Sequence, residues 1–231
     1  MKRFWTTAEA VAAEGGWGVR LDERPLRTPG RVPLLVPTEA LARAIAGEWA
    51  SAEETIDPRA MPLTGLTNAA IDRVLPDRAA FAAGLARYAE ADLACYRAEG
   101  PETLVERQQQ SWDSLLGWAR RRFDVDFAVT SGIVHVAQPK PTVERLAHEV
   151  AALDAFRLAG LSPLVTIGGS MVAALAVLEG AITPDDAWAA VSIDERWQVE
   201  KWGSDAEAEL AMANRRRDFL AAARFLELLG A

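Results

Sequence analysis

Cysteine and histidine are scarce in this chain. The single cysteine, Cys95, excludes an internal disulfide and any site that needs several thiolate ligands. The two histidines, His135 and His148, have no sequence neighbour that would complete a local pair of metal ligands. We therefore expect no metal site, and the low cysteine content fits a reducing compartment.

Long apolar runs are also missing. The N-terminal stretch MKRFWTTAEAVAAEGG lacks an apolar segment of signal-peptide length and is short and acidic for a transit peptide, so we expect a mature cytoplasmic protein. Residues 158–178 carry no charge, but Pro163 and several Gly, Ser and Thr residues interrupt them. The remaining run, residues 164–178, is shorter than a bilayer span and predicts a helix that is buried on all sides.

Positive charge is not concentrated anywhere in the chain. The formal net charge is −8, from 25 Lys and Arg against 33 Asp and Glu, and residues 77–231 hold −7 of it. Nucleic-acid binding needs clustered Lys and Arg. The two short basic runs, residues 120–122 and 215–217, lie in helical patterns that predict solvated faces, so the sequence disfavours a nucleic-acid partner.

The composition is that of a globular protein, and its pattern changes near Pro76. Before this point, alternation at residues 17–21, 24–28 and 32–36 predicts short strands, and helices follow at 38–54 and 64–74. After it, long amphipathic patterns dominate. We predict an α+β fold, in which a small N-terminal mixed α/β domain (residues 1–76) packs on a larger all-helical C-terminal domain (residues 77–231).

The second part of the chain divides into several predicted helices. Phe81, Leu85, Tyr88 and Cys95 mark the first, and the apolar positions from Trp112 to Phe123 mark the next. A short β-like piece lies at 131–136, and further helices are expected at 142–159, 164–179, 184–202 and 205–229. Thr183 is a predicted N-cap before Pro184, and Ser204 with Glu207 matches a capping box.

Two motifs suggest chemistry but have simpler explanations. Gly168–Gly169–Ser170 lacks the lysine of a phosphate loop and the spacing of a dinucleotide fingerprint or a nucleophile elbow, so close helix packing explains it better. The segment RPLRTPGR, residues 24–31, offers arginines that could bind an anion. A basic hairpin edge that deters aggregation is the alternative.

The helix predicted at 184–202, which contains most of the segment SIDERWQVEKWG (residues 192–203), has two apolar sides. One side carries Trp188, Val191, Val199 and Trp202. Glu195 lies in the middle of this stripe and Gln198 at its edge, whereas Ile193 and Trp197 point the opposite way. A carboxylate among tryptophans is costly unless it is paired or reaches solvent. Glu195 therefore either meets an arginine inside the fold or belongs to a surface that waits for a partner chain.

Asp92 repeats this pattern at the centre of another apolar stripe. Two embedded acids could form an acid/base pair, so a small hydrolase that uses Asp92, Glu195 and His135 is an alternative function. No substrate-binding motif accompanies these residues. The hydrolase hypothesis requires at least two of them within hydrogen-bond reach in one pocket.

Several long blocks of the sequence resemble a known family. In chain order they are LDERPLRTPGR, VPTEALARAIAGEW, IDPRAMPLTGLTNAAIDRV, DLACYRAEGPETLVERQ with WDSLLGWA, and DERWQVEKWG. The series is similar to the ATP synthase assembly chaperones that bind the α subunit of the F-type ATPase in mitochondria and related bacteria. The resemblance covers about residues 3–229.

This resemblance implies a chaperone and not an enzyme, with no cofactor. It implies that the unassembled α subunit is the partner and that the chaperone shields the surface of that subunit that later meets β. The implied partner-binding residues are Asp194, Glu195, Gln198, Trp202 and Gly203, to which the two-sided helix adds Trp197. We expect a protein that is monomeric when free, acts in the bacterial cytoplasm without membrane insertion, and has relatives in the mitochondrial matrix. A structural subunit of a stable assembly is a third possibility.

Overall fold

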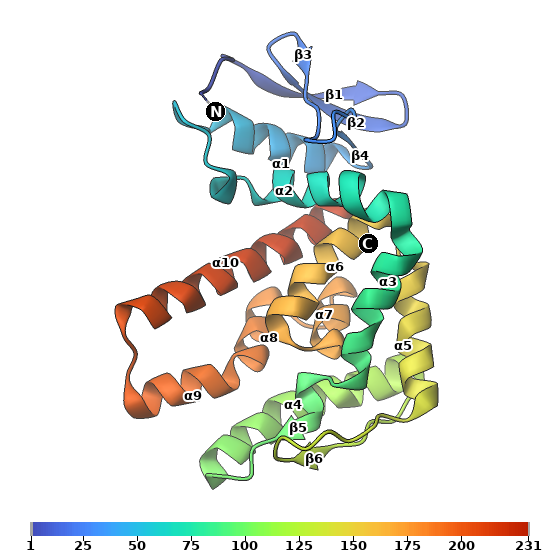
Figure 1. The fold of residues 1–231 in the computed structure, drawn as a ribbon, viewed down its shortest axis with the longest axis vertical. Helices are drawn as coiled ribbons and strands as arrows, with labels where there is room; N and C mark the ends of the chain where they lie inside the picture. The colour runs from blue at the N-terminus through green and yellow to red at the C-terminus, as the bar shows by residue number, and fades with distance from the viewer. Residues whose placement is uncertain (1, 231) are drawn as a thin grey trace. The chain divides into compact units, whose positions relative to one another are not determined.

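The computed structural model describes residues 2–230 and shows a mostly helical chain with small sheets (Figure 1). The strands are β1 (Ala8–Ala13), β2 (Gly16–Leu21), β3 (Arg24–Pro25), β4 (Leu35–Val36), β5 (Tyr96–Arg97) and β6 (Thr130–Ser131). The α-helices are α1 (Glu39–Ala50), α2 (Pro62–Ala69), α3 (Arg78–Ala86), α4 (Glu102–Phe123), α5 (Lys140–Ala152), α6 (Ala155–Gly168), α7 (Met171–Leu178), α8 (Pro184–Val191), α9 (Ile193–Trp202) and α10 (Ala206–Leu229). Short 3-10 or π segments are η1 (Pro58–Ala60), η2 (Ala70–Val74), η3 (Leu75–Asp77), η4 (Arg87–Glu90) and η5 (Leu93–Cys95).

The chain divides into two compact units that are not contiguous in sequence. Unit 1 comprises Met1–Arg78, Asp154–Gly160 and Arg224–Ala231, and unit 2 comprises Ala79–Leu153 and Leu161–Ala223. The first change of unit lies close to the predicted change near residue 76. The two later segments of unit 1 differ from the predicted division, because α6 and α10 each contribute residues to both units. The pattern of apolar and polar residues does not show which part of a long helix packs with which unit.

Unit 1 contains an antiparallel sheet in which β2 pairs with β1, β3 and β4. The predicted strand at 17–21 and the turn at Asp22 are confirmed, and Asp22 adopts the left-handed backbone with φ 52°. The prediction missed β1. The predicted strands at 24–28 and 32–36 shrink to two-residue pairs, since prolines at positions 25 and 33 have no N–H to donate to a ladder.

Helix α1 covers this sheet and begins where the sequence predicts. The Thr38 side chain accepts a hydrogen bond from the Leu41 N–H at 3.2 Å, as an N-cap does. Two tryptophans then join the parts of unit 1. Trp5 donates to the Trp49 carbonyl at 3.1 Å, and Trp49 donates to the Thr64 hydroxyl at 3.2 Å. Buried indoles with satisfied N–H groups fix the position of α2 against α1.

Unit 2 has α4 and α7 among its most deeply buried helices. The predicted apolar face of α4 is confirmed, since Trp112, Leu116 and Phe123 are almost completely buried. Residues 171–176 of α7 are buried without exception, which confirms the prediction of a buried helix in this part of the chain. Among the described helices, none is long and apolar enough to cross a membrane.

Several predicted helix boundaries in unit 2 are wrong. Cys95 does not lie on the helix of Phe81, because α3 ends at Ala86 and gives way to η4 and η5. The predicted break near Pro163 is absent, and Pro163 lies inside α6. That helix begins instead at Ala155, directly after Asp154, whose carboxylate accepts from the Phe156 and Arg157 N–H groups. The next break, at Gly169, uses a left-handed backbone with φ 67° that glycine adopts without strain.

The predicted helix at 184–202 is two helices, α8 and α9, separated at Ser192. The Ser192 hydroxyl donates to the Trp188 carbonyl at 2.6 Å, a back-bond of the kind that bends helices. The predicted N-cap at Thr183 is confirmed by its contact with the Asp186 N–H at 3.1 Å. The predicted capping box at Ser204 is wrong, because the Asp205 carboxylate accepts from the Ala208 N–H at the start of α10.

Candidate functional site

The candidate site is a hollow between α9 and the first half of α10, both in unit 2. Figure 1 shows these helices as a hairpin, orange and red, joined by residues 203–205. The hollow has a volume of about 490 Å³. Its lining is mainly apolar, with one ion pair: Glu195, Gln198, Val199, Trp202, Gly203, Ser204, Ala208, Glu209, Ala211, Met212 and Arg215. Four of the six predicted partner-binding residues are among them.

Glu195 meets an arginine at this hollow. Its Oε1 accepts hydrogen bonds from both Nη1 and Nη2 of Arg215, each at 3.1 Å. The side chains of Glu195 and Arg215 are 40% and 43% exposed, so Glu195 meets an arginine at the surface of the fold and not in its interior. The carboxylate is paired, and it also reaches solvent. A pair this exposed contributes about 0–1 kcal/mol to folding, which leaves Glu195 available to a partner at little cost.

The two tryptophans of α9 have different environments. Trp202 is 74% exposed beside the hollow, whereas Trp197 is only 7% exposed. Their rings meet edge to face, with centroids 5.4 Å apart. The prediction placed Trp197 on an accessible surface, and its burial instead makes it the support against which Trp202 rests. The predicted stripe that joined Trp188 to Trp202 does not exist, because the break at Ser192 puts Trp188 on α8, where it is buried.

Of the other predicted residues, Asp194 points into the fold. Its Oδ1 accepts from the amide of Gln108 at 2.7 Å, and Gln108 is almost completely buried. Gln198 is exposed and lines the hollow. Gly203 ends α9 with φ 77°, a left-handed conformation that turns the chain toward α10. These contacts make Asp194 and Gly203 positioning residues of the α9–α10 hairpin.

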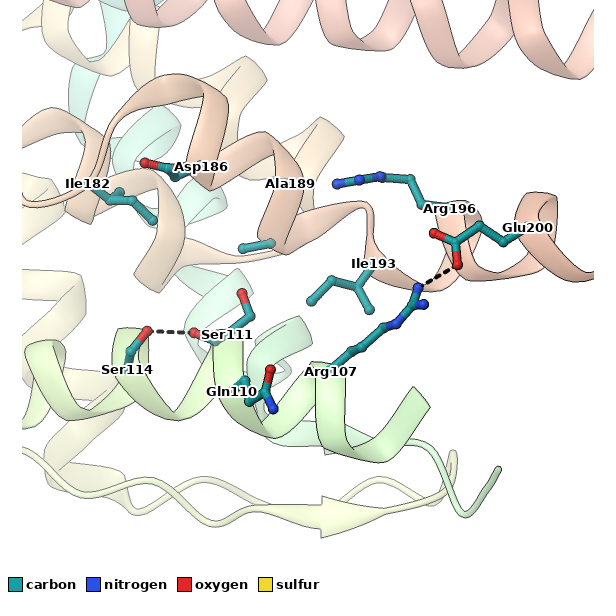
Figure 2. Close-up of a pocket in the computed structure, with 11 residues that line it drawn as sticks. Arg107, Gln110, Ser111, Ser114, Ile182, Asp186, Ala189, Ile193, Arg196 and Glu200 are labelled. Atoms are coloured by element: carbon teal, nitrogen blue, oxygen red, sulfur yellow. Dashed lines mark hydrogen bonds and ion pairs between the residues drawn. The ribbon is translucent and has the colours of Figure 1, made fainter. Parts of the chain in front are cut away.

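Helix α9 is bordered by two further hollows of unit 2. One, of about 720 Å³, lies between α4, α8 and α9, and Figure 2 shows its lining residues. There Arg107 of α4 reaches Glu200 of α9, with Nη1 to Oε2 at 2.7 Å. The other, of about 470 Å³, lies between α8, α9 and α10 and shares Glu209 and Met212 with the candidate site. Helix α9 is thus held by few apolar contacts, with Trp197 as its one buried residue.

Asp92, the second embedded acid, has a structural role. Its carboxylate accepts from the Ala94 N–H, the Ser170 hydroxyl and the Val172 N–H, at 2.8–2.9 Å. Burial raises the pKa of this carboxyl, and the hydrogen bond from Val172 is the largest of the effects that oppose the rise. The motif Gly168–Gly169–Ser170 belongs to the same arrangement, because Ser170 caps α7 by accepting from the Ala173 N–H. Asp92 therefore fixes η5 to the start of α7.

The structure does not meet the requirement of the hydrolase hypothesis. Among the described residues, no hydrogen bond joins any two of Asp92, Glu195 and His135, and His135 instead contacts the Tyr96 hydroxyl at 3.1 Å. No group of three potential metal-ligating side chains occurs within residues 2–230. Burial, with the nearby Asp92 charge, raises the pKa of Cys95 to about 12, so this thiol is a poor nucleophile.

The basic hairpin of residues 24–31 has its own internal anion. The Asp72 carboxylate accepts from the Thr28 hydroxyl at 2.7 Å and from the Gly30 N–H at 2.9 Å. A side chain at Gly30 would collide with this carboxylate, since an added Cβ would lie 2.7 Å from its oxygen. Asp72 thus uses two of the loop's donors, whereas the side chains of Arg24, Arg27 and Arg31 are exposed.

Sequence reasoning missed the contribution of α10 to the site. Arg215 was predicted to lie on a solvated face, yet it binds Glu195 across the hollow. Ala208, Ala211 and Met212 form the apolar wall opposite Trp202. Their spacing of three and four residues was a usable signal, because it places all three on one face of a helix. Nothing in the sequence showed that this face lies opposite α9.

Comparison with known families points to a chaperone. A family model described as ATP12 chaperone protein matches residues 2–120. A curated relative, the mitochondrial protein atp12 of Schizosaccharomyces pombe, is 26% identical over 221 residues, which cover 90% of this chain and 75% of the relative. These matches agree with the resemblance found in the sequence blocks.

Solved structures show the same fold. The crystal structure of Atp12 from Paracoccus denitrificans is 46% identical, with a TM-score of 0.93, and the match covers 99% of this chain and 98% of that one. A solved protein of Agrobacterium tumefaciens is 37% identical, also with a TM-score of 0.93, over 99% of this chain and 86% of that one. The α+β fold with a helical C-terminal part is confirmed by these structures.

Proposed function

The chain belongs to the ATP12 chaperone family of ATP synthase assembly chaperones, and from this membership we propose that it binds the unassembled α subunit of the F-type ATP synthase. It holds that subunit until β arrives and so prevents its aggregation. The binding surface is the hollow between α9 and α10, with Trp202 and the Glu195–Arg215 pair at its centre.

The observation that carries this proposal is the exposure of Trp202. An indole that is 74% exposed beside an apolar hollow leaves a large apolar surface in water, which folding alone does not favour. Tryptophan and arginine are the residues that most often anchor protein interfaces. Met212 lies opposite and has a flexible side chain that adapts to the shape of a partner. The site has the composition of an interface before its partner is bound.

A holding chaperone of this kind needs no catalytic group, and we propose that the protein has no enzymatic activity. The chaperone must bind an apolar surface of the α subunit more favourably than water does, and it must then release that surface to the final partner. Moderate affinity suffices, because assembly of the α/β ring removes free α subunit by mass action. The net charge of −8 keeps the chaperone soluble while the hollow is open. We place this role in the bacterial cytoplasm and expect a monomer when free.

The test is dilution of denatured cognate α subunit into buffer with and without the protein, followed by light scattering. We expect wild type to suppress aggregation and Trp202→Ala to lose most of this effect, because the mutation removes the largest apolar side chain of the hollow. Phe4→Ala is the matched control. Phe4 is also an exposed aromatic that meets a buried tryptophan edge to face, but it lies in unit 1.

Equal suppression by wild type, Trp202→Ala and Phe4→Ala would place the binding surface elsewhere. No suppression by wild type would refute α-subunit binding. Co-purification at fixed stoichiometry with the mature synthase would instead indicate a structural subunit, because a chaperone leaves when assembly is complete.

A further inference from the structure

A second surface of unit 2 lies on the segment between α4 and α5. Figure 1 shows residues 124–139 as an extended arm that runs beside β5. The buried side chain of Gln138 closes the base of this arm, since its amide donates to the Ala128 carbonyl at 2.9 Å and accepts from the Ala128 N–H at 3.0 Å. The Thr142 hydroxyl adds a hydrogen bond to the Asp126 carbonyl. The arm is thus a clamped loop with a fixed base.

The outer part of the arm exposes apolar side chains. Ile133 is 99% exposed and Val134 is 75% exposed, the highest values among the large apolar residues of the described chain. Residues 127–139 contain no charged side chain, although a quarter of the whole chain is charged. Proteins normally protect an exposed extended segment with charges. This one lacks that protection at its tip.

The main chain of the same segment has no partners. The backbone N–H and C=O groups of residues 133–137 make no hydrogen bond to any described residue. By contrast, the preceding residues are held, because β6 pairs with β5 in parallel and Gly132 donates to the Arg97 carbonyl at 2.8 Å. His135 is oriented by the Tyr96 hydroxyl. The arm therefore presents free donors and acceptors from a backbone that is anchored on both sides.

We infer that residues 133–137 bind an extended, uncharged segment of the α subunit by strand addition. Main-chain hydrogen bonds pair the two segments, and Ile133 and Val134 pack against apolar side chains of the partner. This inference rests on the proposed function, and it adds a second contact to the hollow between α9 and α10. Two contacts of moderate strength on one client act together, because the second forms within the complex already made by the first.

The exposed groups of the arm indicate what kind of segment binds to it. Water hydrates the free backbone groups of the arm but leaves its apolar side chains uncovered, whereas an extended chain bonds the first and covers the second. An acidic or basic segment would find no counter-charge in residues 127–139. A second copy of this protein fits less well, because each copy brings a net charge of −8. A newly made α subunit has not yet paired its own interface and offers such segments to its chaperone.

Hydrogen exchange with mass spectrometry tests the inference on the full chain. On addition of cognate α subunit, amides 133–137 should exchange at least about tenfold more slowly, as hydrogen-bonded amides do. The double variant Ile133→Ser with Val134→Ser should bind α about tenfold more weakly or worse, because two aliphatic contacts are lost. Leu75→Ser is the control, since Leu75 is 61% exposed and lies in unit 1.

The outcomes separate this inference from the proposed function. If α binds but amides 133–137 exchange as before and the double variant binds like wild type, the inference is overturned while α-subunit binding stands. If wild type does not bind α, both fail. Slower exchange of these amides at high protein concentration without α would identify a second copy as the occupant and overturn the assignment. Circular dichroism of the double variant shows whether its fold is intact.

Discussion

Charge reversal at Glu195 separates an interface residue from a structural one. Glu195 shares a partly exposed ion pair with Arg215, at 3.1 Å from each terminal nitrogen. Loss of such a pair costs about 0–1 kcal/mol, and the like-charge contact in Glu195→Lys adds a similar small amount. At about 2–4 °C per kcal/mol for a chain of this size, we expect the thermal midpoint to fall by no more than about 8 °C. Loss of an interfacial charge contact, by contrast, costs about 2–5 kcal/mol of binding, so α-subunit affinity should fall about 30-fold or more.

The chain supplies a matched control on the same helix. Glu200 pairs with Arg107, and both side chains are 47% exposed, but Glu200 faces the hollow between α4, α8 and α9 (Figure 2). Glu200→Lys should lower the thermal midpoint by the same small amount and leave α binding unchanged. A charge swap, Glu195→Lys with Arg215→Glu, should restore the midpoint without restoring α binding, because the ion pair returns while the surface presented to α stays altered.

Two results would refute this reasoning. A loss of more than about 10 °C in Glu195→Lys would make the pair a structural element of the α9–α10 hairpin. Unchanged α affinity with an unchanged midpoint would show that the hollow does not contact α. Differential scanning fluorimetry gives the midpoint, and titration of immobilised α subunit gives the affinity.

Two further predictions concern unit 2. Asp92→Asn should lower the free energy of unfolding by about 1–3 kcal/mol in urea titrations, because it replaces one carboxylate oxygen by an NH2 group and so sets a donor against a buried donor; no loss of stability would contradict the structural role of Asp92. Because burial raises the pKa of Cys95 to about 12, the thiol stays protonated and should react with a thiol reagent at pH 8 only as fast as the chain unfolds. Rapid labelling of the native protein would show that Cys95 is accessible.

Local signals in the sequence predicted much of the fold. The start of α1 at Thr38, the start of α8 after Thr183 and the long helix that ends at residue 229 are each confirmed. These features depend on side chains that bond their own backbone or on a regular spacing of apolar residues, so nearby residues contain the information. Helix breaks inside apolar stretches were predicted less well. Pro163 lies within α6, because packing of the surrounding helix outweighs the lost hydrogen bond.

For the candidate site, the sequence by itself determined the segment 192–203, with its embedded acid and its two tryptophans. It also predicted that Glu195 either meets an arginine or faces a partner. Only the tertiary structure showed that α9 and α10 form the two walls of the hollow. Arg215 lies twenty residues beyond Glu195 in the sequence, and the turn at Gly203 brings the two residues into contact. The same holds for the burial of Trp197 and the exposure of Trp202. Periodicity assigns each side chain to a face of its helix, whereas the packing of other helices decides which face is covered.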